Sequence, residues 1–134
     1  MDNSKSNIEI ATESDVVQVR QVGRELSRKL GFGLTDQARI TTGISELARN
    51  ILLYAGSGQI ILQVVEDQGR RGIEILAEDK GPGIVCLEQA MTDGFSTSRG
   101  LGVGLPGTKR LMDELYIESS VGIGTRVVAR KWLN

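Results

Sequence analysis

The pattern of apolar and polar residues in the first half of the chain predicts one short strand and two amphipathic helices. Residues 8–10 alternate as in a strand, and residues 12–15 resemble the capping box that begins many helices. From there, apolar side chains recur every three or four residues up to about Leu30. A second apolar stripe of the same spacing begins near residue 35 or 36 and ends at about Tyr54.

In the second half, alternating and β-branched residues predict two hairpins with a third helix between them. Residues 59–66 and 73–79 form an antiparallel hairpin with a longer loop. A helix over roughly residues 105–115 follows, and strands over residues 116–120 and 125–132 form the last hairpin.

Glycine and both prolines are concentrated in a long segment, residues 79–107, between the two hairpins. These residues disfavour regular structure. A loop of such length in a small chain is usually either a functional lid or disordered, and its strand-like start and helix-like end argue against disorder. We expect a lid over about residues 84–104, hinged on glycines at both ends.

The order of the elements predicts the fold class. The order β, α, α, β, β, lid, α, β, β suits a two-layer α+β sandwich, in which helices cover one face of a mixed, mostly antiparallel sheet. At 134 residues, the chain is expected to form a single domain over residues 1–134.

Composition narrows the classes of function. The formal net charge of −1 provides no basic surface for nucleic acid. Because no apolar run could span a membrane and no signal-peptide pattern opens the chain, we expect a cytoplasmic protein. The absence of histidine excludes Ser-His-Asp catalysis and histidine metal sites, and the single cysteine, Cys86, excludes an intrachain disulfide. Chemistry would then depend on carboxylates, amides, backbone groups and a cofactor.

Glu46 and Asn50 are the first candidate pair. They stand four residues apart on the second predicted helix, so their side chains share one face. A carboxylate and an amide at this spacing could hold a hydroxyl group and a hard cation together. A solvated helix face with a local hydrogen bond is the simpler interpretation of the pair alone.

Asp79 is the second candidate, because strand alternation turns it toward the core at the strand's open end. A buried carboxylate needs a donor, and the exocyclic amine of adenine is one. Gly81 and Gly83 would let the backbone pass close to a flat base. An Asp-Gly turn is the alternative. Thr125, after a glycine hairpin turn, could place a hydroxyl beside Asp79.

Gly100, Gly102 and Gly104 precede the third predicted helix, whose N-terminus offers free N–H groups to phosphate. Residues 102–107 match the dinucleotide pattern G-x-G-x-x-G by letter, but no buried strand precedes them. The P-loop pattern fails because no Gly-Lys-Ser/Thr follows. We favour phosphate binding over a simple flexible helix entry.

The order and spacing of these motifs resemble the N, G1, G2 and G3 boxes of the GHKL ATPase superfamily, over essentially the whole chain. The four motifs are Glu46-x-x-x-Asn50, Asp79-x-Gly81-x-Gly83, Gly100-x-Gly102-x-Gly104 and Gly124-Thr125. Within the superfamily, residues 44–50, 94–98 and 104–114 resemble the switch serine/threonine kinases of the bacterial stressosome. Val85-Cys86 departs from related loops, which often carry proline there.

The resemblance implies the Bergerat fold, Mg-ATP and a role for each matching residue. Asn50 would coordinate Mg²⁺, and Glu46 would orient or deprotonate the attacking hydroxyl. Asp79 would accept a hydrogen bond from the adenine amine, supported by Thr125. The base would lie near the backbone of Gly81 and Gly83, and the phosphates near Gly100, Leu101, Gly102, Val103, Gly104 and Leu105. Apart from the resemblance, the glycines of the lid predict that the segment between Gly83 and Gly100 becomes ordered only with nucleotide.

The resemblance also implies protein partners. These are STAS-domain scaffold and antagonist proteins phosphorylated on Ser or Thr, and a downstream effector such as a PP2C-type phosphatase. An anti-sigma-factor kinase, acting as a binding regulator, is the alternative, since it shares the same boxes. A free-standing ATPase is third, because no second domain is expected that could convert hydrolysis into work.

Overall fold

The computed structural model describes residues 5–81 and 104–133. Almost all of the predicted lid, residues 84–104, therefore lies outside the described residues. The elements, in chain order, are β1 Lys5–Ile10, α1 Glu13–Leu30, α2 Leu34–Tyr54, β2 Gly58–Asp67, β3 Arg70–Asp79, α4 Gly104–Leu111, β4 Glu114–Ser120 and β5 Gly124–Trp132.

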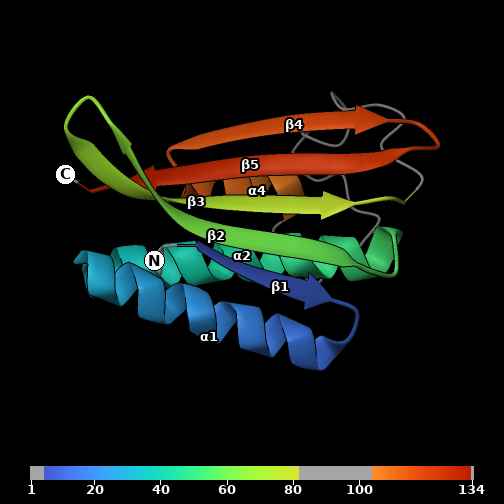
Figure 1. Cartoon of the computed structure of the whole chain (residues 1–134), viewed down its shortest axis with the longest axis horizontal. Helices are drawn as coiled ribbons and strands as arrows, with labels where there is room; N and C mark the ends of the chain where they lie inside the picture. The colour runs from blue at the N-terminus through green and yellow to red at the C-terminus, as the bar shows by residue number, and fades with distance from the viewer. Residues whose placement is uncertain (1–4, 82–103, 134) are drawn as a thin grey trace.

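The strands form one five-stranded sheet in the order β1-β2-β3-β5-β4. All pairings within the described ranges are antiparallel, so the mixed pairing expected from the sequence is not found there. The helices lie together on one face of this sheet (Figure 1). The predicted two-layer α+β sandwich is confirmed.

Local capping explains where α1 begins and ends. The Thr12 hydroxyl accepts a hydrogen bond from the Asp15 backbone N–H, and the Asp15 carboxylate accepts one from the Thr12 N–H, which completes a capping box. A further hydrogen bond from the Ala11 N–H is the main cause that lowers the pKa of the Asp15 carboxyl. Gly31 ends the helix in the left-handed conformation, with φ 101°.

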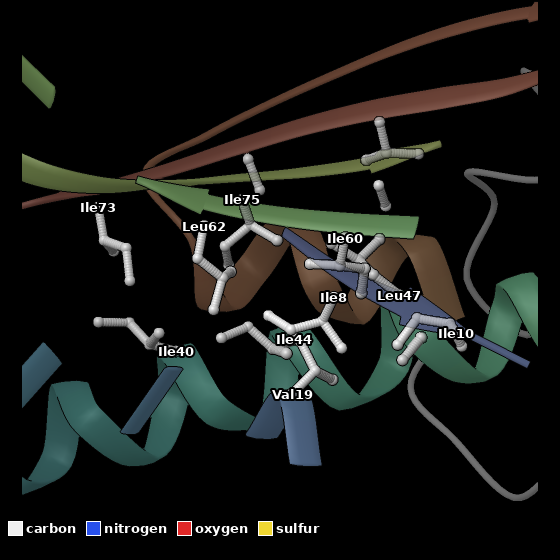
Figure 2. Packing of buried hydrophobic residues seen from close by; sticks show 14 of the residues in the cluster. Ile8, Ile10, Val19, Ile40, Ile44, Leu47, Ile60, Leu62, Ile73 and Ile75 are labelled. Carbon is white, nitrogen blue, oxygen red and sulfur yellow. The ribbon is translucent and has the colours of Figure 1, made fainter. Parts of the chain in front are cut away.

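The core lies between α1 and α2 on one side and the sheet on the other (Figure 2). Ile44 and Leu47 of α2 face Ile60 and Leu62 of β2, and all four are almost fully buried. Gly23 of α1 allows close packing here, because a Cβ added to it would lie 2.2 Å from Ile44 Cδ1. Gly23 thus lets α1 pack closely against α2.

Two boundaries differ from the sequence-based expectation. The β2–β3 hairpin closes through a tight Gln68-Gly69 turn with positive φ at both residues, and not through a longer loop. The third helix ends at Leu111 instead of about residue 115. The cause is Asp113, whose N–H donates to the Arg130 carbonyl and whose carboxylate accepts from the Trp132 N–H. These bonds to β5 begin strand β4 early.

A buried lysine connects the ends of α2 and α4. The Lys131 Nζ of β5 lies 3.5 Å from Asp113 Oδ1, just after α4, and 3.9 Å from Asp36 Oδ1 in the first turn of α2. A buried ammonium group needs such carboxylates nearby. Lys131 of β5 thus links the first turn of α2 and the residue pair after α4 to the sheet.

Candidate active site

Helix α2 carries the first part of the candidate site. Gly43, Glu46 and Asn50 follow one another at intervals of three and four residues, so they share one face of the helix. Helix α4 packs on this face, since a Cβ added to Gly43 would meet the Met112 sulfur at 3.5 Å and the Thr108 methyl group at 3.7 Å.

Glu46 is buried, which excludes the simpler interpretation of a solvated helix face. Its side chain is only 9% exposed. The Arg49 guanidinium donates a hydrogen bond of 3.0 Å from Nη1 to Glu46 Oε2. Asn50, one turn later, is half-buried. Acid and amide therefore stand together at the border between core and solvent.

Asp79 carries the second part of the site. It continues the row of buried residues on the helix-facing side of β3, as expected from strand alternation. Its Oδ1 accepts a hydrogen bond of 2.9 Å from the Gly81 N–H. Thr125 of β5 is its partner in the strand register, and the Thr125 hydroxyl lies 3.0 Å from the Ser119 hydroxyl. The two residues are therefore paired across the strands, while the Thr125 hydroxyl contacts Ser119, and its role beside Asp79 stays a prediction.

The backbone after Asp79 passes very close to its neighbours. A Cβ added to Gly81 would lie 2.6 Å from the Ala55 Cβ at the end of α2, and one added to Gly124 would lie 2.1 Å from the Asp79 carbonyl oxygen. Only glycine fits at either position. The glycine of the Gly124-Thr125 motif is thus required by the strand beside it as well as by the turn.

Replacing Gly124 with alanine should lower the free energy of unfolding by about 2–3 kcal/mol, because the new Cβ would meet the Asp79 and Lys80 backbone at a φ of 148°. The matched control is Gly122→Ala. Its φ of 80° is also unfavourable to alanine, but a Cβ there would meet nothing within 4 Å, so a loss of only about 1 kcal/mol is expected. Urea unfolding of both variants checks this; equal losses would contradict it.

Gly58 shows how the two parts of the site come together. A Cβ added there would lie 2.8 Å from Ile51 Cγ2 of α2 and 3.1 Å from the Asp79 Cβ. Ile51, the residue next to Asn50, and Asp79, at the end of β3, therefore both lie against Gly58. A cavity of about 600 Å³ opens at this end of the sheet, and Asp79, Ser119 and Thr125 are among the residues that line it. None of its described lining residues belongs to α2 or α4, so the cavity lies beside the Asp79 part of the site and does not reach Glu46 or Asn50.

The chemical character of the site follows from these residues. Partial burial raises the pKa of the Tyr54 phenol, one turn after Asn50. No group of three or more Asp, Glu, Cys or His side chains placed to hold a metal ion occurs within residues 5–81 and 104–133.

The remaining predicted site residues belong to the segments that are expected from the sequence to bind phosphate and to hinge the lid. Gly83, Gly100, Leu101, Gly102 and Val103 lie outside the described residues. Gly104 begins α4, and Leu105, next to it, packs partly buried against the core.

Three residues near the site were not singled out from the sequence. Arg49 could have been found from its spacing of three from Glu46. Ser119 and Ala55 gave no sequence signal, because their positions beside Thr125 and Gly81 depend on tertiary packing alone.

A family model described as "Histidine kinase-, DNA gyrase B-, and HSP90-like ATPase" matches residues 35–134, which include both parts of the site. The chain belongs to this ATPase family. Membership implies the use of ATP, and it agrees with the superfamily that the motif spacing indicated. In the part of the chain that the structure describes, no helix is long and apolar enough to cross a membrane.

Relatives within the ATPase family define the class of enzyme. The chain is 59% identical to the serine/threonine-protein kinase RsbT of Bacillus subtilis (strain 168), over 98% of each chain. At this identity over nearly the full length, the chain is a serine/threonine protein kinase. It is also 31% identical to an anti-sigma F factor of Clostridium novyi (strain NT), over 70% of this chain and 69% of the relative.

A solved structure supports the fold assignment. The RsbU and RsbW domains of a Mycobacterium tuberculosis protein align with a TM-score of 0.61 at 19% identity, over 96% of this chain and 33% of that one. This likeness concerns the fold alone.

Proposed function

We propose that this kinase transfers the γ-phosphoryl group of Mg-ATP to Ser or Thr residues of STAS-domain scaffold and antagonist proteins of the RsbS and RsbR type. Once released from the phosphorylated scaffold, it acts on a downstream effector such as a PP2C-type phosphatase. This cycle would belong to a bacterial stress response in the cytoplasm. The observation that carries the proposal is Glu46, a buried acid one helical turn from Asn50.

The roles of the site residues follow from their chemistry. Phosphoryl transfer depends mainly on positioning and on neutralising charge. Glu46 would accept or orient the proton of the attacking hydroxyl, and Asp79 would accept a hydrogen bond from the adenine amine. Gly81 keeps the backbone after β3 close to Ala55 at the end of α2, and the base would lie beside this backbone. The N-terminus of α4 would face the phosphates.

The residues present fit a magnesium ion. Mg²⁺ prefers oxygen ligands and usually keeps several waters while it binds one or two protein groups and substrate phosphates. The half-buried amide of Asn50 supplies one such oxygen. The ion would neutralise the charge that develops on the phosphates.

A second candidate function is an anti-sigma-factor kinase that acts as a binding regulator. The identity to an anti-sigma F factor over more than two thirds of both chains favours it. Both functions use the same nucleotide site, so the partner protein distinguishes them.

The test is to identify the acceptor protein. The purified kinase is incubated with Mg-ATP labelled at the γ-phosphate and a mixture of purified STAS-domain proteins, and the modified residue is located by mass spectrometry. We expect label on one Ser or Thr of a STAS domain. A parallel pull-down with sigma factors serves as the alternative arm. Retention of a sigma factor without transfer to any STAS protein would reject the proposed function and favour the regulator.

A further inference from the structure

Arg49 forms a hydrogen bond with Glu46, the carboxylate proposed to receive the proton. It lies three residues after Glu46 on α2, and its Nη1 donates to Glu46 Oε2 at 3.0 Å. The Arg49 side chain is 46% exposed, whereas that of Glu46 is 9% exposed. The guanidinium group therefore approaches a buried carboxylate from the solvent side.

The same spacing occurs elsewhere on α2 with a different environment. Arg39 donates to Asp36 at 3.0 Å, but the Asp36 side chain is 29% exposed and also lies near Lys131. Ion pairs between exposed groups contribute little, because water and salt screen them. The pair of Arg49 with Glu46 differs because its acid is largely removed from water, so the charge-assisted hydrogen bond restrains it more firmly.

The helix also places Arg49 next to the other candidate ligand. Arg49 and Asn50 are neighbours on the turn that follows Glu46, one of them exposed and one half-buried. A glutamate side chain has three rotatable bonds, and proton acceptance requires its carboxylate within hydrogen-bond reach of one hydroxyl. A misplacement of about 1 Å can reduce a reaction rate 100-fold.

We infer that Arg49 is a positioning residue for phosphoryl transfer. It holds one carboxylate oxygen of Glu46 and thereby fixes the orientation of the acid toward the acceptor hydroxyl. The inference rests on the proposed function, because it takes Glu46 as the group that receives the proton. Arg49 itself contacts neither ATP nor the acceptor in this role.

Arg49→Gln should lower kcat for transfer to the acceptor protein by about 10- to 100-fold, with the KM for ATP changed by no more than about twofold. Arg49→Lys should recover part of the loss, since an ammonium group can bind one carboxylate oxygen but lacks the planar fork of a guanidinium. The measurement is steady-state transfer of labelled phosphate to the STAS-domain protein found as described above. A purely structural role would not separate kcat from KM in this way.

Arg39→Gln is the matched control. It removes an arginine with the same spacing and the same charge from the same helix, and kcat should stay within about twofold of wild type. Thermal unfolding of the three variants checks that each is folded.

The outcomes separate this inference from the proposed function. No transfer by the wild-type kinase to any STAS protein rejects the proposed function, and this inference with it. Transfer by wild type that is lost in Glu46→Gln but normal in Arg49→Gln rejects the positioning role alone. An equal fall of kcat in Arg39→Gln and Arg49→Gln also rejects it, because the cause is then general charge.

Discussion

Replacing Glu46 with glutamine should slow phosphoryl transfer by about 100- to 10,000-fold, the range found when a general base is removed. Glutamine has the same shape as glutamate but cannot take a proton at neutral pH. Because Glu46 is buried on α2 beside α4, the variant should leave the packing of both helices unchanged. Single-turnover transfer of labelled phosphate to the acceptor protein measures the effect.

Two comparisons make this result specific. ATP affinity of Glu46→Gln, measured by calorimetry, should stay within about twofold of wild type, so that the loss lies in the chemical step. Glu25→Gln is the matched control, since Glu25 also pairs with an arginine three residues later, but on the exposed surface of α1. Unimpaired transfer by Glu46→Gln would show that another group receives the proton.

Replacing Asp79 with alanine should weaken the binding of Mg-ATP by about 10- to 150-fold, which corresponds to one lost hydrogen bond to a charged group. The variant would lose the acceptor that we propose for the adenine amine, and it loses the hydrogen bond that Asp79 Oδ1 accepts from the Gly81 N–H. Calorimetric titration with Mg-ATP measures the change.

Guanine carries a carbonyl oxygen where adenine carries its amine, so wild type should bind Mg-GTP far more weakly than Mg-ATP.

The control for Asp79 is its neighbour in β3. Glu78 points to the opposite face of the sheet, where it accepts a hydrogen bond from Gln59 and lies 3.6 Å from Arg126. Glu78→Gln should therefore bind Mg-ATP as wild type does. If both variants lost affinity equally, the cause would be general charge near the cavity and not a specific contact with the base.

The fold was largely predictable because its signals are local. The capping box at Thr12, the glycine at 31 and the alternation along β3 each act within a few residues. The same local rule placed Asp79 on the inner face of the sheet. Helix α4 was predicted too long because the bonds that begin β4 come from residues of β5, which are distant in sequence.

The candidate site was predictable in part for the same reason. The spacing of Glu46 and Asn50 fixes their shared helix face, but not the burial of Glu46, which depends on packing around α2. Nor does spacing reveal that Ala55 lies against Gly81. Contacts of this kind arise only when α2 and the sheet are assembled.

Gly58 has a practical consequence for protein design. Position 58 at the start of β2 can accept no methyl group, because atoms of the end of β3 and the Ile51 side chain of α2 occupy the space beside it. A nucleotide site with this geometry could not be transplanted as an isolated loop or peptide. Anyone who wished to build it into another scaffold would have to carry over the helix and the neighbouring strands together, with their glycines intact.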